Sequence, residues 1–264
     1  MAEWLCSGLQ SRLCRFDSDP SLQTPCPSPG GGIGRRNGLK IRRPQGHPGS
    51  IPGRGTTYHV DPVLTVQGVH LWRGDRHVLR GVSFEGGAGK CVLLTGKNGA
   101  GKTTLIRAIA GLLDPEEGQV FWRGAPARER RNEYHAELAY LGHEPPLKGD
   151  LSARENLKYS IGIRRAVTAA EIDAALTRTG AHAFADRAVR MLSAGQRRRV
   201  ALAGVLLANA VLWLLDEPTT NLDAEGQQLV RELIVEQLAR GGLVVAAVHQ
   251  SLPLPAEQLV NLEL

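Results

Sequence analysis

The chain has 264 residues, of which 42% are hydrophobic, 32 are Lys or Arg and 26 are Asp or Glu, and its isoelectric point is near 9.4. This length supplies enough apolar material for a buried core, and four cysteines without paired spacing exclude both a disulfide scaffold and a structural zinc site. Since no apolar run reaches the roughly 18–20 residues that cross a bilayer, we expect a chain that is soluble or at most peripheral to a membrane.

The positive charge is concentrated in the first 59 residues, which hold eight basic and three acidic side chains, whereas the rest of the chain holds 24 and 23. Seven of the 15 prolines and ten of the 31 glycines also lie there. Such a segment cannot bury enough apolar surface to offset the entropy of ordering it. We therefore expect residues 1–59 to be either a disordered extension or the result of a translation start assigned too early, and the folded domain to span residues 60–264. A targeting peptide is disfavoured because residues 1–16 lack an apolar core, and a nucleic-acid-binding arm because aromatic residues are not interleaved.

Short β-rich runs begin at residue 63, with strands predicted at 63–66 and within 78–84. The apolar run at 91–95 is typical of a strand that is buried on both faces of a sheet. A helix-period segment follows at 103–113, and Asp114-Pro115 closes it. Three further helical segments are predicted at 128–138, 153–161 and 169–179.

Helices predicted at 201–208 and 224–240 precede two more buried strands, at 211–215 and 243–248. Strands that alternate with helices indicate an α/β fold with a mainly parallel sheet covered on both faces. Ligands of such sheets bind at the carboxyl ends of the strands, and polar residues follow all three buried strands here.

Residues 96–103 read Gly-Lys-Asn-Gly-Ala-Gly-Lys-Thr and match the phosphate-loop pattern G-x-x-x-x-G-K-[ST] between a predicted strand and a predicted helix. The glycines allow successive backbone N–H groups to surround phosphate oxygens, and the helix N-terminus adds partial positive charge. Lys102 is expected to reach the β- and γ-phosphates, and the Thr103 hydroxyl to bind Mg²⁺. The nucleotide-binding residues predicted in this segment are Gly96, Asn98, Gly99, Gly101, Lys102, Thr103 and Thr104.

The buried strand at 211–215 ends in Asp216-Glu217. Asp216 is placed to hold the metal ion through water, and Glu217 is the candidate general base that polarises the attacking water. An isolated Asp-Glu pair would be interpreted as a helix cap, but the phosphate loop favours the catalytic interpretation.

Residues 192–196, Leu-Ser-Ala-Gly-Gln, open a helix with Ser193 as its N-cap, and the exposed N–H groups form a potential anion site. Arg197, Arg198 and Arg199 follow at the helix start, where they oppose the helix dipole. Either an anionic partner relieves this local cost, or the arginines form a solvated face.

With these motifs, residues 64–250 resemble the nucleotide-binding subunit of an ATP-binding-cassette (ABC) transporter. In that resemblance 192–196 corresponds to the signature motif with Ala194 where Gly is commoner, 221–223 to the loop that crosses the dimer interface, and His249 to the catalytic switch histidine. The implied fold is a P-loop NTPase with a RecA-like core, an antiparallel β edge and a helical subdomain at about 125–195.

The resemblance also implies ATP and Mg²⁺ as cofactors and a dimer that sandwiches two ATP molecules. Ser193, Gly195, Gln196 and Asp223 of one copy would then complete the site of the other copy. Integral membrane subunits are expected to dock around 143–157, and no nucleic acid is expected as a partner.

Two positions depart from the family pattern. His143 occupies the place of a Gln that touches Mg²⁺ and water, so it is a candidate metal contact whose titration near neutral pH could affect coupling. The aromatic residue that stacks on adenine is either Trp72 or replaced by Arg73, because both align with that position.

Within the family, Gly142-His143, Lys148, residues 151–157 and 192–199, and Trp213 are similar to the haem exporter ATP-binding subunit of bacterial cytochrome c maturation. This implies ATP hydrolysis coupled to haem export or delivery, at the cytoplasmic face of the inner membrane, with indirect contact to a haem-handling chaperone. Neither composition nor spacing indicates haem. The alternatives are the ATPase of another small-substrate exporter and a soluble ABC ATPase without a transport role. A P-loop kinase is a further class, but it gives no reason for the 192–196 motif.

Overall fold

The computed structural model of the chain describes residues 63–248 and 253–264. The extension expected at residues 1–59 and the candidate switch residue His249 therefore lie outside the described residues.

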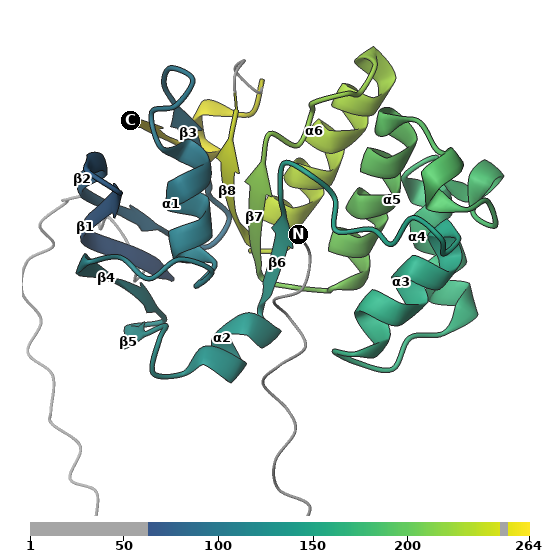
Figure 1. Ribbon diagram of the computed structural model, residues 1–264, viewed down its shortest axis with the longest axis horizontal. Helices are drawn as coiled ribbons and strands as arrows, with labels where there is room; N and C mark the ends of the chain where they lie inside the picture. Colours follow the sequence, from purple (N-terminus) through teal and green to yellow (C-terminus); the bar gives the residue numbers. More distant parts are fainter. Residues whose placement is uncertain (1–62, 249–252) are drawn as a thin grey trace, which may run out of the picture. The chain divides into compact units, whose positions relative to one another are not determined.

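The strands form two sheets, one antiparallel with the order β2-β1-β4-β5 and one parallel with the order β6-β7-β8-β3-β9 (Figure 1). The antiparallel sheet contains β1 (Leu64–Arg73), β2 (Arg76–Gly86), β4 (Glu117–Trp122) and β5 (Ala125–Pro126). The parallel sheet contains β3 (Cys91–Thr95), β6 (Leu138–Leu141), β7 (Leu212–Asp216), β8 (Leu243–Ala247) and β9 (Leu259–Glu263). The α/β fold predicted from the sequence is confirmed.

The central strands of the parallel sheet are buried because helices cover both of its faces. Strands β7 and β8 are buried along their whole length, and β3 is buried at four of its five positions. These strands confirm the three buried strands predicted from apolar runs. In β1, buried residues alternate with more exposed ones, as expected when only one face of a sheet meets the core.

Six α-helices are described: α1 (Lys102–Ile109), α2 (Arg131–Ala136), α3 (Ala153–Gly162), α4 (Ala169–Arg178), α5 (Ala194–Leu207) and α6 (Ala224–Ala239). Helix α1 lies between the two sheets, and its Leu105 and Ile106 pack in one core with Leu94 and Val245 (Figure 1). Helix α6 packs on the opposite face of the parallel sheet together with the middle of α5. The start of α1 is therefore fixed at the carboxyl end of the parallel strands.

Helices α3, α4 and α5 pack around a third hydrophobic cluster. These helices correspond to the helical subdomain that the resemblance implies. Two of its helices begin with capping boxes, Ser152 with Glu155 and Thr168 with Glu171. The predicted start of this subdomain near residue 125 is wrong, because residues 125–141 contribute β5 and β6 to the two sheets. The helix predicted at 128–138 is likewise shorter, since Leu138 pairs with Leu212 of β7 and begins a strand.

Within residues 63–248 and 253–264, no helix combines the length and the apolar character needed to cross a membrane.

Candidate active site

The phosphate loop connects β3 to α1 and depends on glycines in left-handed conformations, with φ of +134° at Gly96 and +109° at Gly101. A Cβ atom on Gly101 would lie only 2.8 Å from Leu79 of β2. The buried Lys102 extends along the loop, and its Nζ donates to the carbonyl oxygens of Gly96 at 2.8 Å and Lys97 at 3.2 Å. The ammonium group is therefore held within the loop that the sequence assigns to phosphate.

Thr103 and Asp216 meet although they lie on different elements. The Thr103 hydroxyl donates to Asp216 Oδ1 at 3.0 Å. The other carboxylate oxygen, Oδ2, is buried without a hydrogen-bond partner among the described residues. Burial raises the pKa of Asp216, and the hydrogen bond from Thr103 opposes this shift.

A hydroxyl beside a buried, unpaired carboxylate oxygen fits Mg²⁺, which prefers oxygen ligands and keeps several waters and substrate phosphates in its shell. In the described part of the chain, no group of three or more His, Cys, Asp or Glu side chains could hold a metal by itself. Thr103 and Asp216 would therefore hold the ion together with the phosphates.

Glu217 has a backbone φ of +51°, which is unusual for a residue with a side chain and turns the chain sharply after β7. Its Oε2 lies 3.3 Å from Nδ1 of His143 and accepts a hydrogen bond from the Thr220 hydroxyl at 3.2 Å. His143 comes from the segment after β6, so neighbouring parallel strands bring the two side chains together. His143 thus contacts the candidate general base in this structure.

A cavity of about 610 Å³ lies at the phosphate loop, and neither Gly96 nor Asp216 is among its lining residues. From the predicted set, Asn98, Gly99, Gly101, Lys102, Thr103, Thr104, His143 and Glu217 line it. Arg76 and Arg107 also line it, although neither was predicted as a site residue. Arg76 could have been found, because the two-residue turn Gly74-Asp75 places it opposite Arg73 in the hairpin.

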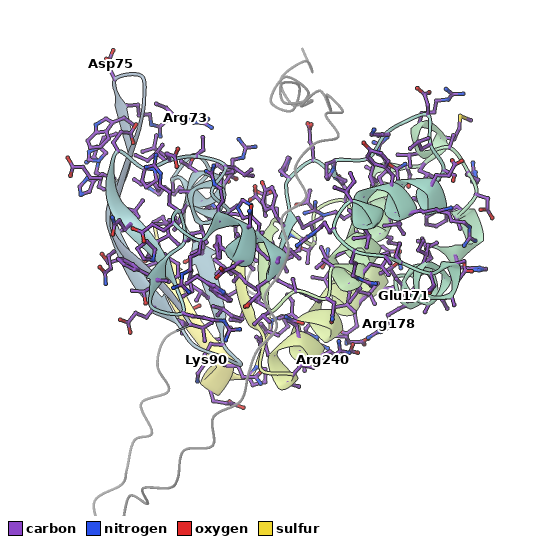
Figure 2. All side chains as sticks on the ribbon, turned by 90° about the horizontal axis from the view of Figure 1, so that it is seen from below. Arg73, Asp75, Lys90, Glu171, Arg178 and Arg240 are labelled. Carbon is purple, nitrogen blue, oxygen red and sulfur yellow. The ribbon has the colours of Figure 1, made fainter. Side chains whose placement is uncertain are left out.

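Trp72 does not line this cavity, whereas Arg73 does. The Trp72 ring stacks on His77, with 3.9 Å between ring centroids and 8° between planes, because both side chains lie on the same face of the β1–β2 pair. Arg73 lies near the tip of this hairpin, close to Asp75 (Figure 2). Arg76 donates from Nη2 to the Gly99 carbonyl at 3.1 Å. Of the two alternatives for the base-side contact, the geometry favours Arg73.

The predicted N-cap role of Ser193 is confirmed: its hydroxyl accepts from the Gln196 N–H, and Gln196 completes a capping box. A Cβ on Gly195 would lie 2.7 Å from the Asn221 carbonyl oxygen, so the signature segment touches the loop after β7. Asp223 caps α6, and the hydrogen bond from the Gly226 N–H lowers the pKa of its carboxyl group, with Arg199 adding to the effect.

Ser193, Gly195, Gln196 and Asp223 line a cavity of about 460 Å³. Within the described residues, this cavity shares no lining residue with the cavity at the phosphate loop. One chain therefore presents the two predicted halves of a nucleotide site at different places.

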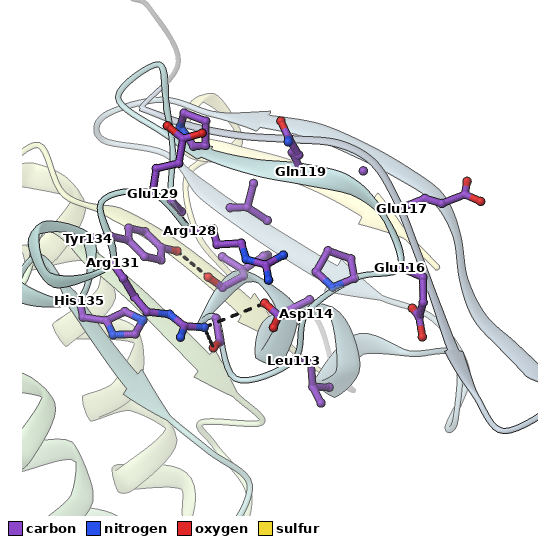
Figure 3. Close-up of a pocket in the computed structure, with 18 residues that line it drawn as sticks. Leu113, Asp114, Glu116, Glu117, Gln119, Arg128, Glu129, Arg131, Tyr134 and His135 are labelled. Atoms are coloured by element: carbon purple, nitrogen blue, oxygen red, sulfur yellow. Dashed lines mark hydrogen bonds and ion pairs between the residues drawn. The ribbon is translucent and has the colours of Figure 1, made fainter. Parts of the chain in front are cut away.

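A further hollow of about 280 Å³ lies at the carboxyl end of α1 (Figure 3). Its Tyr134 hydroxyl donates to the Ile109 carbonyl at 2.7 Å, and Arg131 donates to the Gly111 carbonyl at 3.2 Å. None of the predicted site residues lines it. Since α1 begins at the phosphate loop and ends here, this hollow is separate from the candidate site.

Known proteins with similar sequences include two curated relatives. "Cytochrome c biogenesis ATP-binding export protein CcmA" of Methylococcus capsulatus is 45% identical over 193 residues, covering 73% of this chain and 93% of the relative. "Cytochrome c biogenesis ATP-binding export protein CcmA 1" of Salmonella typhimurium is 41% identical over 202 residues, covering 76% and 97%.

Solved structures give the same fold. A putative ABC transporter ATP-binding protein from Pyrococcus furiosus has a TM-score of 0.66 and 27% identity, covering 76% of this chain and 96% of that chain. A bacterial Atm1-family ABC exporter with ATP bound has a TM-score of 0.64 and 28% identity, covering 72% of this chain and 34% of that chain. The sequence profile described as "ABC transporter" matches residues 79–220. With the phosphate loop, the strand-end carboxylates and the capped signature helix in place, the chain belongs to the ABC transporter family.

Proposed function

We propose that the chain binds and hydrolyses ATP as the nucleotide-binding subunit of a membrane export complex that serves cytochrome c biogenesis. The observation that carries the ATPase part is that Lys102, Thr103 and Glu217 line the same cavity. The curated relatives, named as export proteins for cytochrome c biogenesis, support the biological role.

In this proposal the loop N–H groups and Lys102 bind the phosphates of ATP. Glu217 accepts a hydrogen bond from the attacking water and withdraws its proton, while His143 and Thr220 orient the carboxylate. Bound Mg²⁺ would neutralise phosphate charge. His249 is proposed, from the family resemblance, to contact the γ-phosphate.

Arg73 and Arg76 are proposed to hold the base side of the nucleotide. A guanidinium group is planar and stacks on aromatic rings, so it can replace an aromatic side chain as a platform. The hydrogen bond from Arg76 to Gly99 fixes the hairpin against the phosphate loop.

The active form is proposed to be a dimer. The signature cavity and the phosphate-loop cavity lie apart in one chain, which supports a second copy whose Ser193, Gly195, Gln196 and Asp223 close the site. The N–H groups at the start of α5 would then face the γ-phosphate.

Membrane subunits are proposed to dock on a groove of about 590 Å³ lined by residues of the 143–149 segment and the start of α5. Buried Asn156 shapes this segment, because its side chain accepts from the Lys148 N–H at 2.7 Å and donates to the Lys148 carbonyl at 3.0 Å. Docking here would place the chain peripherally at the cytoplasmic face of a bacterial inner membrane. Haem is the proposed transported or delivered species, with a haem-handling chaperone as an indirect partner.

The substitution Glu217→Gln in the full-length chain tests the ATPase proposal. We expect turnover to fall by about 100-fold or more with ATP binding retained, and ATP to yield a stable dimer by light scattering. Glu129→Gln, on the rim of the separate hollow, is the control and should leave turnover unchanged. Full turnover in Glu217→Gln would contradict the assigned chemistry, and a monomer with bound ATP would contradict the sandwich.

A further inference from the structure

Arg198 lies in the second turn of α5, and it is only 2% exposed. Its guanidinium donates five hydrogen bonds, all to backbone carbonyl oxygens. Arginine has five N–H groups, so this arrangement satisfies every donor of the side chain. Burying a positive charge is costly, and these five hydrogen bonds to backbone carbonyl oxygens offset that cost.

The five carbonyls belong to two loops that end neighbouring strands. Nη1 donates to Gly142 at 2.7 Å and to His143 at 3.3 Å, in the segment after β6. Nη2 donates to Asp216 at 2.7 Å and to Glu217 at 2.5 Å, and Nε donates to Pro218 at 3.3 Å. One side chain therefore ties the backbone of His143 to the backbone of Glu217.

The strained backbone of Glu217 explains why such a tie matters. A left-handed conformation is unfavourable for a non-glycine residue and persists only when its surroundings fix it. Arg198 contacts the carbonyls before, at and after this residue. It therefore holds the turn that aims the Glu217 carboxylate at the cavity.

We infer that Arg198 is a positioning residue for ATP hydrolysis, which locks the two loops and thereby sets the His143–Glu217 pair at the phosphate cavity. This role rests on the proposed function of Glu217 as the general base. Arg198 belongs to the helix capped by Ser193, so the geometry of the general base is fixed to the signature helix.

Neither lysine nor glutamine can take over this role. Lysine has three N–H donors on one nitrogen, and glutamine has two on one nitrogen. The guanidinium of Arg198, in contrast, has five N–H donors in a planar fork, and these reach five carbonyl oxygens of the two loops. Either substitution removes at least two of the five hydrogen bonds between α5 and the two loops and allows the Glu217 turn to relax.

The test compares Arg198→Gln and Arg198→Lys with the unaltered full-length chain in steady-state ATPase assays and in equilibrium binding of a fluorescent ATP analogue. Because a displacement of about 1 Å at a reacting group costs on the order of 100-fold, we expect kcat to fall by about that factor. The dissociation constant of the analogue should change less than about threefold, because the phosphate loop is untouched. If Arg198→Gln does not fold, the same comparison of kcat and of the dissociation constant is made with Arg198→Lys.

Arg165→Gln is the matched control. Arg165 donates from Nε and Nη2 to the Leu207 carbonyl at 3.3 and 3.0 Å, at the other end of the same helix and away from the cavity. This variant should lower the unfolding midpoint and leave kcat unchanged. A fall in kcat in Arg165→Gln as large as in the Arg198 variants would reduce Arg198 to a stabilising role and overturn the inference.

A double-mutant cycle with His143→Ala measures the coupling between the two substitutions in kcat, which a general loss of stability would not produce. If Arg198 acts through the His143–Glu217 pair, adding Arg198→Gln to His143→Ala should lower kcat much less than it does alone. Fully multiplicative effects would overturn the inference. Full activity of Arg198→Gln beside an inactive Glu217→Gln would overturn only the role of Arg198, whereas an active Glu217→Gln would overturn the proposed function itself.

Discussion

The Thr103 hydroxyl donates a hydrogen bond to Asp216 Oδ1 at 3.0 Å, across 113 residues of sequence. This contact joins the first turn of α1 to the end of β7 and places two of the candidate magnesium contacts side by side. The parallel order β7-β8-β3 makes it possible, because the carboxyl ends of these strands share one edge.

Thr103→Ala should lower ATP turnover on the order of 10- to 100-fold and raise the Mg²⁺ concentration needed for half-maximal activity. The reason is that the substitution removes the hydroxyl and leaves buried Asp216 Oδ1 without its donor. Thr103→Ser keeps the hydroxyl and serves as the control. Equal Mg²⁺ dependence in the two variants, measured by phosphate release, would contradict the metal assignment.

Gly195→Ala should impair ATP-dependent dimer formation and turnover. A Cβ would lie 2.7 Å from the Asn221 carbonyl oxygen of the same chain and would therefore displace the loop that is proposed to cross the dimer interface. Binding of ATP to the phosphate loop of the monomer should persist. Gly204→Ala on the same helix is the control, since its Cβ would meet Leu157 at an ordinary 3.5 Å. Light scattering with and without ATP measures the difference, and dimerisation of both variants like the unaltered chain would argue against the signature interface.

Lys148→Glu should weaken association with the membrane subunits while the isolated chain keeps its ATP binding. The Lys148 ammonium lies 3.9 Å above the Tyr159 ring beside the proposed docking groove, so the substitution reverses charge on that face. Lys90→Glu is the control, because Lys90 lies directly before β3, near Arg240 at the end of α6 (Figure 2), and does not line the groove. Co-purification with the membrane subunits is the measurement; loss of nucleotide binding in Lys148→Glu would show that the docking assignment is wrong.

Cys91 should resist alkylation in the folded chain at pH 8. Burial raises the pKa of its thiol to about 12, so only about one thiol in ten thousand is ionised at that pH, and the side chain is also inaccessible. Since the folded state favours the neutral thiol, this group's contribution to stability is present below the ordinary cysteine pKa and is lost as pH rises through the folded value. Mass spectrometry of the Cys91 peptide after iodoacetamide treatment, native against urea-unfolded, checks this; equal labelling in both states would contradict the burial.

The sequence alone predicted the central strands of the parallel sheet and the loop between β3 and α1. Strands buried on both faces are continuous apolar runs, and the phosphate loop is a local pattern that its own glycines determine. The N-cap role of Ser193 was predictable for the same reason, since a helix start depends on a few adjacent residues.

Strands β6 and β9 were not predicted, because the four-residue β6 and the partly exposed β9 become strands through their pairing with β7 and β3. That Arg73 lines the cavity and Trp72 does not likewise depends on how the hairpin packs beside the phosphate loop, a long-range contact that the turn Gly74-Asp75 does not specify.

Local sequence thus determined which chemical groups the chain carries, because loops and caps form from consecutive residues. Only the tertiary structure decided which groups meet: Thr103 with Asp216, His143 with Glu217, and buried Arg198 with the carbonyls of the loops after β6 and β7. Three consecutive arginines look alike in sequence, and only the packing of α5 against the ends of β6 and β7 selects the one that is buried.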